Sequence, residues 1–308
     1  MNIYEQIKKN NFNTWVILTV FIALLLSIGM GFDYFYGVGM GLPLFTIIAL
    51  IVAVVSSYSG YMYGDQLVIS STHAREPNPE DIKEKEWQDV VEEMSIAAGL
   101  PLPKAYVTDD PDPNAFATGR DPAHSSIVAT RGLLEVLNRE ELQAVASHEM
   151  SHIRNFDTRV MLIVAVLVGS VALLAGWAGR MLFWGRGNRK NGGAAALVIL
   201  AIWLVAVVLA PILSQLIAMC VSRKREYLAD ASGAELTRNP TALASALDKI
   251  SSHFQPSSLI NQGTSHLCIA DPLNKSLGAK EGWFADLFAT HPPIQKRIEI
   301  LNQMAYKK

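Results

Sequence analysis

The chain contains very little cysteine, and this excludes several kinds of stabilised fold. Cys220 and Cys268 are the two cysteines among 308 residues, and no CxxC pair is present. A disulfide framework and a CxxC-based metal or redox site are therefore excluded. The scarcity of cysteine favours soluble parts that face a reducing compartment such as the cytosol.

Charge is also scarce. Lys, Arg, Asp and Glu make up 18% of the chain, hydrophobic residues make up 50%, and the mean hydropathy is +0.23. The formal net charge is −2, and the aromatic residues are scattered. No basic surface or stacking platform for nucleic acid is expected, so nucleic acid is excluded as a partner. The charged fraction is low for a soluble protein.

What the chain has instead is long apolar runs. Four of them are long enough to span a bilayer: Trp15–Phe32, Leu42–Tyr61, Val160–Ala178 and Ala194–Val221. The first could be a cleaved signal peptide, but the residues near Gly29 make a poor cleavage site and a second run follows. The last two could form a buried, shallow or re-entrant hairpin. We predict four transmembrane helices and contact with a lipid bilayer.

The charges beside these runs predict an orientation in the membrane. Lys8 and Lys9 precede the first run, whereas the loop Gly31–Gly41 has no Lys or Arg, which places the N-terminus inside the cell. Two crossings return the chain to the cytoplasm after Tyr61. Charge bias would place the basic loop Arg180–Asn191 inside the cell, whereas a third crossing from the cytoplasm places it outside. We keep an even number of crossings between the two soluble parts, because both must then lie on the same side.

The segment Asn138–Asn155 contains an HExxH motif, His148–His152. Because positions i and i+4 of a helix share a face, both imidazoles can bind one metal ion while Glu149 reaches a water beside it. Asn138 and Glu141 predict a capping box at the start of this helix. The alternative is a surface helix with two solvated histidines. We expect the motif helix to end at about Asn155, with the third apolar run directly continuous with it.

The other soluble segments predict a mainly helical domain with a small sheet. Apolar spacing and Gly99 as a C-terminal cap indicate a helix over Asn78–Gly99. Two short strands are expected at Lys104–Thr108 and Ser125–Thr130. The segment between them, Asp109–Arg120, is rich in turn-forming residues. Later helices are expected at Pro240–Ile250 and Ile294–Met304, with a loop-like segment between them at Phe254–Phe284.

The apolar runs divide the chain into alternating parts. Residues 1–62 hold the first two runs, and residues 63–159 form the first half of a soluble domain. Residues 160–221 hold the second pair, and residues 222–308 form the second half. Both halves must meet if the motif helix is to find a third metal ligand.

Four short sequences occur in order along the chain: NAFATG at Asn114–Gly119, HEMSH at His148–His152, REYLAD at Arg225–Asp230 and THPP at Thr290–Pro293. Together with the four apolar runs they resemble the HtpX-type membrane zinc metalloproteases, a bacterial or archaeal, heat-shock-linked family related to the CAAX prenyl endopeptidases. The resemblance covers essentially the whole chain. It implies a zincin domain of the gluzincin type, held in the cytoplasmic (inner) membrane with its active site facing the cytoplasm. It also implies proteolysis of misfolded or damaged membrane proteins.

The resemblance implies one zinc ion per chain, bound by His148, His152 and Glu226. Asp230 lies four residues after Glu226, where it would support a ligand histidine through the ring N–H. Catalytic zinc takes three protein ligands and keeps one open position, which this set satisfies. The alternative is that Glu226 and Asp230 are solvated acids. Manganese or cobalt is not excluded by the ligand types.

The resemblance also implies the catalytic and substrate-binding residues. Glu149 would act as general base on a zinc-activated water. His291 would help to bind the oxyanion, or would instead cap the last helix. An edge strand would hold the substrate backbone at Asn114, Ala115, Phe116 and Ala117. The alternative for this strand is an ordinary Asx turn.

Two other functions remain open on the sequence. One is a dedicated CAAX-type protease that acts on a C-terminal tail, although more than four spans would be expected. The other is a zinc-stabilised membrane scaffold or holdase, although structural zinc sites are usually closed and cysteine-rich. The natural substrate and the oligomeric state are not predicted. The remaining histidines are expected in loops or on the surface: His73, His124, His253 and His266.

Overall fold

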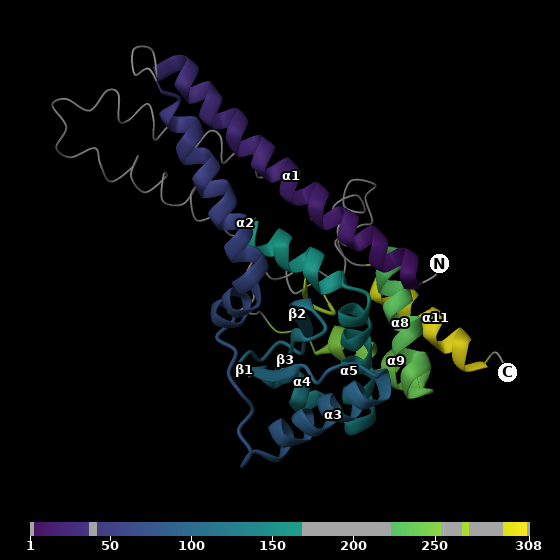
Figure 1. Ribbon diagram of the computed structural model, residues 1–308. Helices are drawn as coiled ribbons and strands as arrows, with labels where there is room; N and C mark the ends of the chain where they lie inside the picture. The colour runs from purple at the N-terminus through teal and green to yellow at the C-terminus, as the bar shows by residue number, and fades with distance from the viewer. Residues whose placement is uncertain are drawn as a thin grey trace.

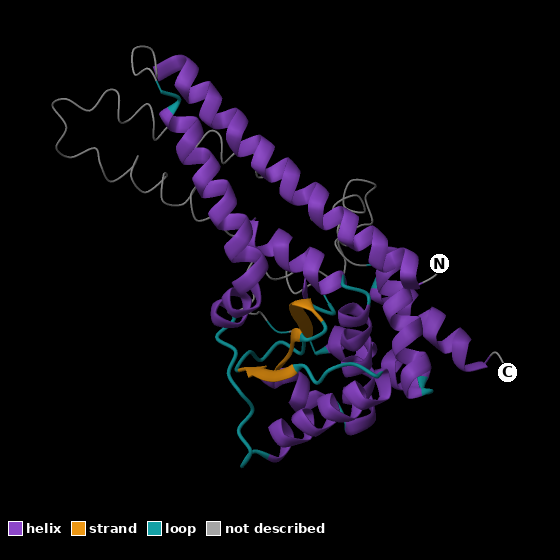
Figure 2. Ribbon diagram, in the orientation of Figure 1, coloured by secondary structure: helices purple, strands orange, loops and turns teal. Residues whose placement is uncertain are grey.

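The computed structural model describes residues 3–36, 42–167, 223–253, 255, 267–270 and 292–306. In chain order the elements are α1 (Ile3–Tyr36), α2 (Leu44–Ser71), α3 (Ile82–Ala98), β1 (Lys104–Thr108), β2 (Ala115–Asp121), β3 (His124–Thr130), α4 (Arg131–Val136), α5 (Arg139–Arg154), α8 (Arg223–Thr237), α9 (Pro240–Ser252) and α11 (Ile294–Tyr306). Residues 157–167 are also helical. Figure 1 shows α1 and α2 projecting side by side from a body of shorter helices, and Figure 2 shows the small sheet inside that body.

Two described helices have the length and composition of membrane spans, over Ile7–Ser27 in α1 and Thr46–Ser71 in α2. α1 buries one stripe at helical spacing, namely Asn10, Thr14, Ile17 and Phe21. Both helices also expose large apolar side chains, including Trp15, Val20, Ile47, Ile51, Val55 and Tyr58. An apolar surface of this extent is unusual in water, so it fits contact with lipid.

The predicted third and fourth apolar runs lie mostly outside the described residues. Residues 160–167 begin the third run, and they are helical and almost all buried. The first two runs are longer helices than predicted. α1 already begins at Ile3, and α2 continues to Ser71, ten residues beyond Tyr61. The extension of α2 is stabilised because Val68 packs on the body of the protein, in a buried cluster with Phe116.

The helix predicted over Asn78–Gly99 begins later than expected. α3 starts at Ile82, because Asp81 is its N-cap and accepts the backbone N–H groups of Lys83 and Glu84. Gly99 is the predicted C-cap and takes the left-handed conformation, with a φ of 64°. The prediction of the C-terminus is therefore confirmed, and the N-terminus differs by one turn.

The sheet has the strand order β1-β3-β2, with β1 parallel and β2 antiparallel to β3. Both predicted strands are present, but the prediction of a turn-rich segment up to Arg120 is wrong, because β2 begins at Ala115. Among the strands in the described part of the chain, β2 lies at an edge of the sheet, as the resemblance implied. Its ladder is irregular between Gly119 and Asp121. Gly119 has a φ of 137°, and a Cβ there would lie 2.3 Å from the carbonyl oxygen of His124.

The sheet is buried on both faces, and alternate residues of its strands point to different cores. Ala117 and Ile127 belong to a core that includes residues of α3, α5 and α9. Phe116 and Val128 belong to a second cluster with residues of α2 and of the helix 157–167. On the face of β2 that belongs to the first core, the side chains of Ala115 and Ala117 are small, which lets α5 pack closely on the sheet.

Candidate metal centre

Helix α5 carries the HExxH motif and begins as predicted. The Asn138 side chain accepts the backbone N–H of Glu141 at 3.0 Å, and the Glu141 carboxylate accepts the backbone N–H of Asn138 at 2.8 Å. Glu141 also accepts bonds from Ser245 at 2.7 Å and Lys249 at 2.8 Å in α9. The start of the motif helix is therefore fixed to the second half of the chain.

The predicted end of the motif helix at about Asn155 is confirmed, but the prediction that the third apolar run is directly continuous with it is wrong. α5 ends at Arg154, and Asn155 and Phe156 form a turn before helix 157–167. Phe156 has a φ of 59°, a left-handed conformation that a helix cannot continue through. The break turns the chain so that Asp157 returns toward the motif helix.

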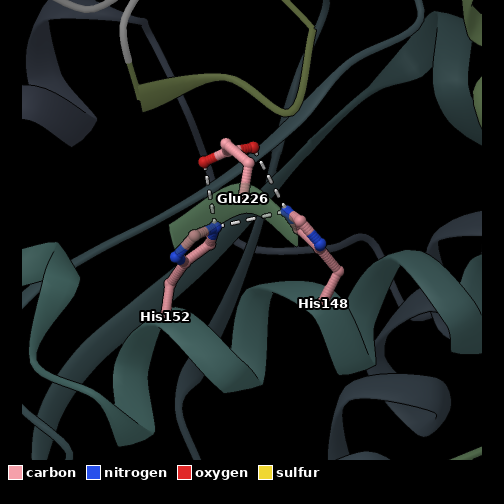
Figure 3. Close-up of side chains that lie close together, drawn as sticks. All are labelled: His148, His152 and Glu226. Atoms are coloured by element: carbon pink, nitrogen blue, oxygen red, sulfur yellow. Dashed lines mark hydrogen bonds and ion pairs between the residues drawn. The ribbon is translucent and has the colours of Figure 1, made fainter. Parts of the chain in front are cut away.

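The structure brings the three predicted zinc ligands together in a buried cluster. Figure 3 shows both imidazoles rising from α5 toward the carboxylate of Glu226, which comes from α8. The two Nε2 atoms of His148 and His152 are 3.2 Å apart. The Glu226 oxygens lie 3.9 Å from His148 Nε2 and 3.6 Å from His152 Nε2. Two ligands bound tetrahedrally at about 2.0–2.1 Å from zinc are about 3.3–3.4 Å apart, so the cluster has the right size.

Each ligand histidine has its own carboxylate partner. The Nδ1 of His148 is 3.0 Å from Asp230, as expected, and the Nδ1 of His152 is 3.1 Å from Asp157. A ring that donates its Nδ1–H presents a lone pair at Nε2. The two Nε2 atoms lie 3.2 Å apart, so one cation bound between the rings would contact both. These residues fit a metal ion.

The charges around the cluster favour a cation. Burial lowers the pKa of His152, but the hydrogen bond that its ring donates to Asp157 and the charges of Glu226, Asp157 and Glu149 outweigh burial and raise the pKa to about 9. Burial raises the pKa of Glu149, and the charge of Glu226 adds to this effect. The charges of both histidines oppose the rise. A buried carboxylate with a raised pKa is suited to accept a proton near neutral pH.

Asp230 is held by a residue that the sequence reasoning missed, Arg297 in α11. Its guanidinium donates to both Asp230 oxygens, at 2.8 and 2.7 Å. Burial raises the pKa of Asp230, but the charge of Arg297 outweighs burial and lowers the pKa to about 2. One signal was available, because Arg297 occupies the apolar stripe of its helix formed by Ile294, Ile298 and Leu301.

Glu226 reaches the motif helix because α8 packs very closely on α5. A Cβ at Gly233 would lie 3.0 Å from the backbone nitrogen of His148 and 3.1 Å from Ser147 Oγ. Ser147 Oγ is also 3.2 Å from the carbonyl oxygen of Gly233 and donates to it. A larger residue at this crossing would push the two ligand-bearing helices apart.

The predicted substrate-binding residues lie at the start of the edge strand β2. In an antiparallel ladder, alternate residues direct their backbone groups to opposite sides, so Ala115 and Ala117 face the outer edge. The carbonyl of Ala115 accepts the N–H of Ile269 at 2.9 Å, and the Asn114 amide donates to the carbonyl of Ala270 at 2.8 Å. The backbone N–H of Ala117 is directed at the Glu149 carboxylate. Phe116 points into the opposite core.

The remaining histidines divide into two groups. His73, His124 and His253 are exposed, which confirms their prediction as surface residues. His266 and His291 lie outside the described residues, so the predicted role of His291 in binding an oxyanion stays a prediction.

Comparison with known proteins gives consistent results. The profile of Peptidase family M48 matches residues 81–305. A Protease HtpX homolog of Streptococcus pneumoniae (strain Hungary19A-6) is 40% identical over 311 residues, covering 98% of this chain and 100% of the relative. A Protease HtpX homolog of Tropheryma whipplei (strain Twist) is 42% identical over 301 residues, covering 98% of each chain. The crystal structure of S. mikatae Ste24p shares the fold, with a TM-score of 0.53 and 18% identity over 96% of this chain and 66% of that chain. The chain therefore belongs to peptidase family M48, the metallopeptidase family that includes the HtpX proteases.

Proposed function

We propose that the protein is a membrane-integral zinc endopeptidase that cleaves misfolded or damaged membrane proteins at the cytoplasmic face. The observation that carries the proposal is the cluster of His148, His152 and Glu226, with ligand atoms 3.2 to 3.9 Å apart. Bound zinc would supply a Lewis acid that polarises the scissile carbonyl and lowers the pKa of a water. The same three ligands in a purely structural site would not need Glu149 buried beside them.

Glu149 is the proposed general base. It follows the first ligand on the same helix and is 2% exposed. We propose that its carboxylate takes a proton from the attacking water and delivers it to the leaving amine. Burial keeps bulk water away from this carboxylate and raises its pKa, so it can accept and return a proton within one turnover.

The substrate backbone is proposed to lie along the outer edge of β2. Ala117 is the residue of this edge whose N–H already faces Glu149. An extended peptide added beside it would have its scissile bond near the ligand cluster. At the start of the strand, Asn114 and Ala115 bind Ala270 and Ile269, so a substrate would enter beyond these two residues or displace that segment.

The contacts of α1 and α2 with the peptidase body support a position of that body on one side of the membrane. Asn10, near the start of α1, contacts Asp157 beside the ligand cluster, and Val68, near the end of α2, packs with Phe116 of β2. The N-terminal part of α1 and the C-terminal end of α2 therefore both contact the peptidase body, as expected if the two helices cross the membrane and return. With Lys8 and Lys9 on the inside, the body would face the cytoplasm.

The proposed function is tested by cleavage of unfolded casein by the full chain in detergent, with zinc and with a chelator. Cleavage that a chelator removes, that zinc restores and that Glu149→Gln lacks is the expected result. A scaffold or holdase would bind zinc without cleaving, and a dedicated C-terminal protease would leave internal casein bonds intact. Orientation is tested by cysteine labels at the exposed positions Glu80 and Asp248, both of which should react only from the cytoplasmic side.

A further inference from the structure

Asp157 connects the proposed zinc site to the N-terminal membrane helix. One of its oxygens, Oδ2, lies 3.1 Å from the Nδ1 of His152. Its other oxygen, Oδ1, accepts a hydrogen bond of 2.7 Å from the side-chain amide of Asn10, 147 residues earlier in the chain. Arg225 Nη1 lies 3.5 Å from the same Oδ1. The partner of one ligand histidine is therefore shared between α1 and the peptidase body.

The two ligand histidines differ in how their carboxylate partners are held. Asp230, the partner of His148, is bound through two bonds by Arg297, and all three residues belong to the peptidase body. Asp157, the partner of His152, instead accepts its shortest bond from Asn10 in α1. The orientation of His152 thus depends on a helix with the properties of a membrane span.

Asn10 also fixes the turn that places Asp157. Its Nδ2 donates to the backbone carbonyl of Asn155 at 2.8 Å, so one amide group binds both sides of the break after α5. Phe156, between these two contacts, is the residue with the left-handed backbone. Without the Asn10 amide, the turn would lose the contact that sets the distance from Asp157 to His152.

A second contact supports the same connection. Arg159 donates from Nη1 to Asn11 Oδ1 at 2.8 Å and from Nε to the carbonyl of Arg120 at the end of β2. Its guanidinium lies over the ring of Phe156, 4.6 Å from the centroid. Two adjacent asparagines of α1 therefore bind the two ends of the segment 155–159.

The position of Asn10 is unusual for a residue that only starts a membrane helix. Its side chain is 0% exposed, although it lies in the polar start of the candidate span Ile7–Ser27, before the apolar run that begins at Trp15. Burial of a carboxamide is unfavourable unless it is hydrogen-bonded, and the Nδ2 of Asn10 makes its two bonds only to the segment after α5. The exposed neighbours Phe12 and Trp15 show that the same helix has an apolar face available.

We propose that Asn10 is a positioning residue of the zinc site, which acts through Asp157 to orient the imidazole of His152. The proposal rests on the proposed function, because it needs His152 to be a zinc ligand. It makes α1 a part of the catalytic structure as well as a membrane anchor. Changes in how α1 sits in the membrane would then alter zinc binding directly.

The test is a double-mutant cycle on zinc affinity, measured by chelator competition with the full chain in detergent. Asp157→Asn should weaken zinc binding by about 10- to 100-fold, as is usual for a residue that supports a metal ligand. Asn10→Ala should weaken it by about 5- to 10-fold, because it acts one bond further away. In the Asp157→Asn background, Asn10→Ala should have little further effect. Asn13→Ala is the matched control, an asparagine one turn later in α1, and it should bind zinc like the unmodified chain.

Two further readouts separate positioning from general stability. The visible spectrum of the Co²⁺-substituted protein should change in Asn10→Ala and not in Asn13→Ala, because it reports ligand geometry. The loss of activity in Asn10→Ala should appear in kcat with KM nearly unchanged. If Asn10→Ala does not fold, Asn10→Ser keeps one donor without added bulk and should still weaken zinc binding measurably.

Zinc affinity and Co²⁺ spectra that do not change in Asn10→Ala or Asn10→Ser would overturn the proposal. An equal effect of Asn10→Ala with and without Asp157→Asn would also overturn it, because the residue would then act by another route. These outcomes are distinct from failure of the proposed function, in which the unmodified chain would bind no stoichiometric zinc or would fail to cleave casein.

Discussion

The guanidinium of Arg297 binds both carboxylate oxygens of Asp230, and the Asp230 Oδ1 atom also lies 3.0 Å from the Nδ1 of His148. Arg297 is completely buried, and its Nη1 also donates to the carbonyl of Ile269 at 2.8 Å. The last helix of the chain therefore supports the first ligand of the motif helix. The same helix also holds Ile269, whose N–H binds the carbonyl of Ala115 in the edge strand β2.

The first prediction concerns Arg297. Arg297→Ala leaves Asp230 as a buried charge without its main partner, so the free energy of unfolding should fall by about 3–5 kcal/mol. Zinc affinity should fall as well, because His148 loses a fixed partner. Thermal unfolding and chelator competition measure the two effects. The exposed neighbour Lys296→Ala is the control, and a similar loss in both variants would show that the ion pair is not the cause.

The second prediction concerns the general base. Glu149→Gln keeps the size of the side chain but removes the group that accepts the proton. The variant should keep stoichiometric zinc while kcat for casein cleavage falls by at least about 100-fold, the usual contribution of acid–base catalysis. Zinc analysis and a cleavage assay on the same sample decide the matter. Near-normal cleavage would remove Glu149 from the mechanism.

The third prediction compares Glu226 with Asp230. Glu226→Gln removes the anionic ligand and should weaken zinc binding by more than about 100-fold. Asp230→Asn removes only the support of His148 and should cost roughly 10- to 100-fold. Chelator competition ranks the two variants. Wild-type affinity in Glu226→Gln would mean that the third ligand is another residue.

The fourth prediction concerns pH. Glu84 is buried between Arg75 and Arg131, at 2.8 and 2.9 Å. The hydrogen bond from Arg75 holds the pKa of Glu84 below its ordinary 4.5 in the folded protein. This carboxylate therefore adds stability above about pH 4.5, and the contribution is lost as pH falls through the lower, folded-state pKa.

Thermal unfolding of the zinc-free protein measures this contribution. At pH 7, Glu84→Gln should lower Tm by about 2–4 °C, the shift that roughly 1 kcal/mol produces in a protein of this size class. The difference in Tm between Glu84→Gln and the unmodified chain should become smaller below about pH 4.5. The exposed Glu80→Gln is the control and should show neither effect. A difference that stays constant with pH would contradict the role of this ion pair.

Local sequence signals predicted the motif helix well. Asn138 is the N-cap of α5 and Glu141 lies in its first turn, so the start of α5 follows from short-range hydrogen bonds alone. Spacing also predicted that His148 and His152 share a face. Glu226 and Asp230 were assigned through the resemblance, and the structure brings Glu226 to the histidines and Asp230 to His148.

Features that depend on distant contacts were predicted less well. The break after α5 has no Gly or Pro to mark it, and it is stabilised by Asn10, more than 140 residues away. The first part of β2 was read as a turn because its small residues have no strand pattern, yet they fit between two cores. Asp157 was missed for the same reason, since its role appears only once the chain turns back.

The most direct test of the account is the zinc coordination itself, measured by X-ray absorption at the zinc edge on the full chain in detergent. The account predicts one zinc per chain with two imidazole nitrogens and oxygen ligands at about 2.0–2.2 Å, and no sulfur shell at about 2.3 Å. Glu226→Gln should alter the oxygen shell and leave the imidazole signal in any zinc that remains bound. A sulfur shell, fewer than two imidazoles, or a spectrum that Glu226→Gln does not change would contradict the account.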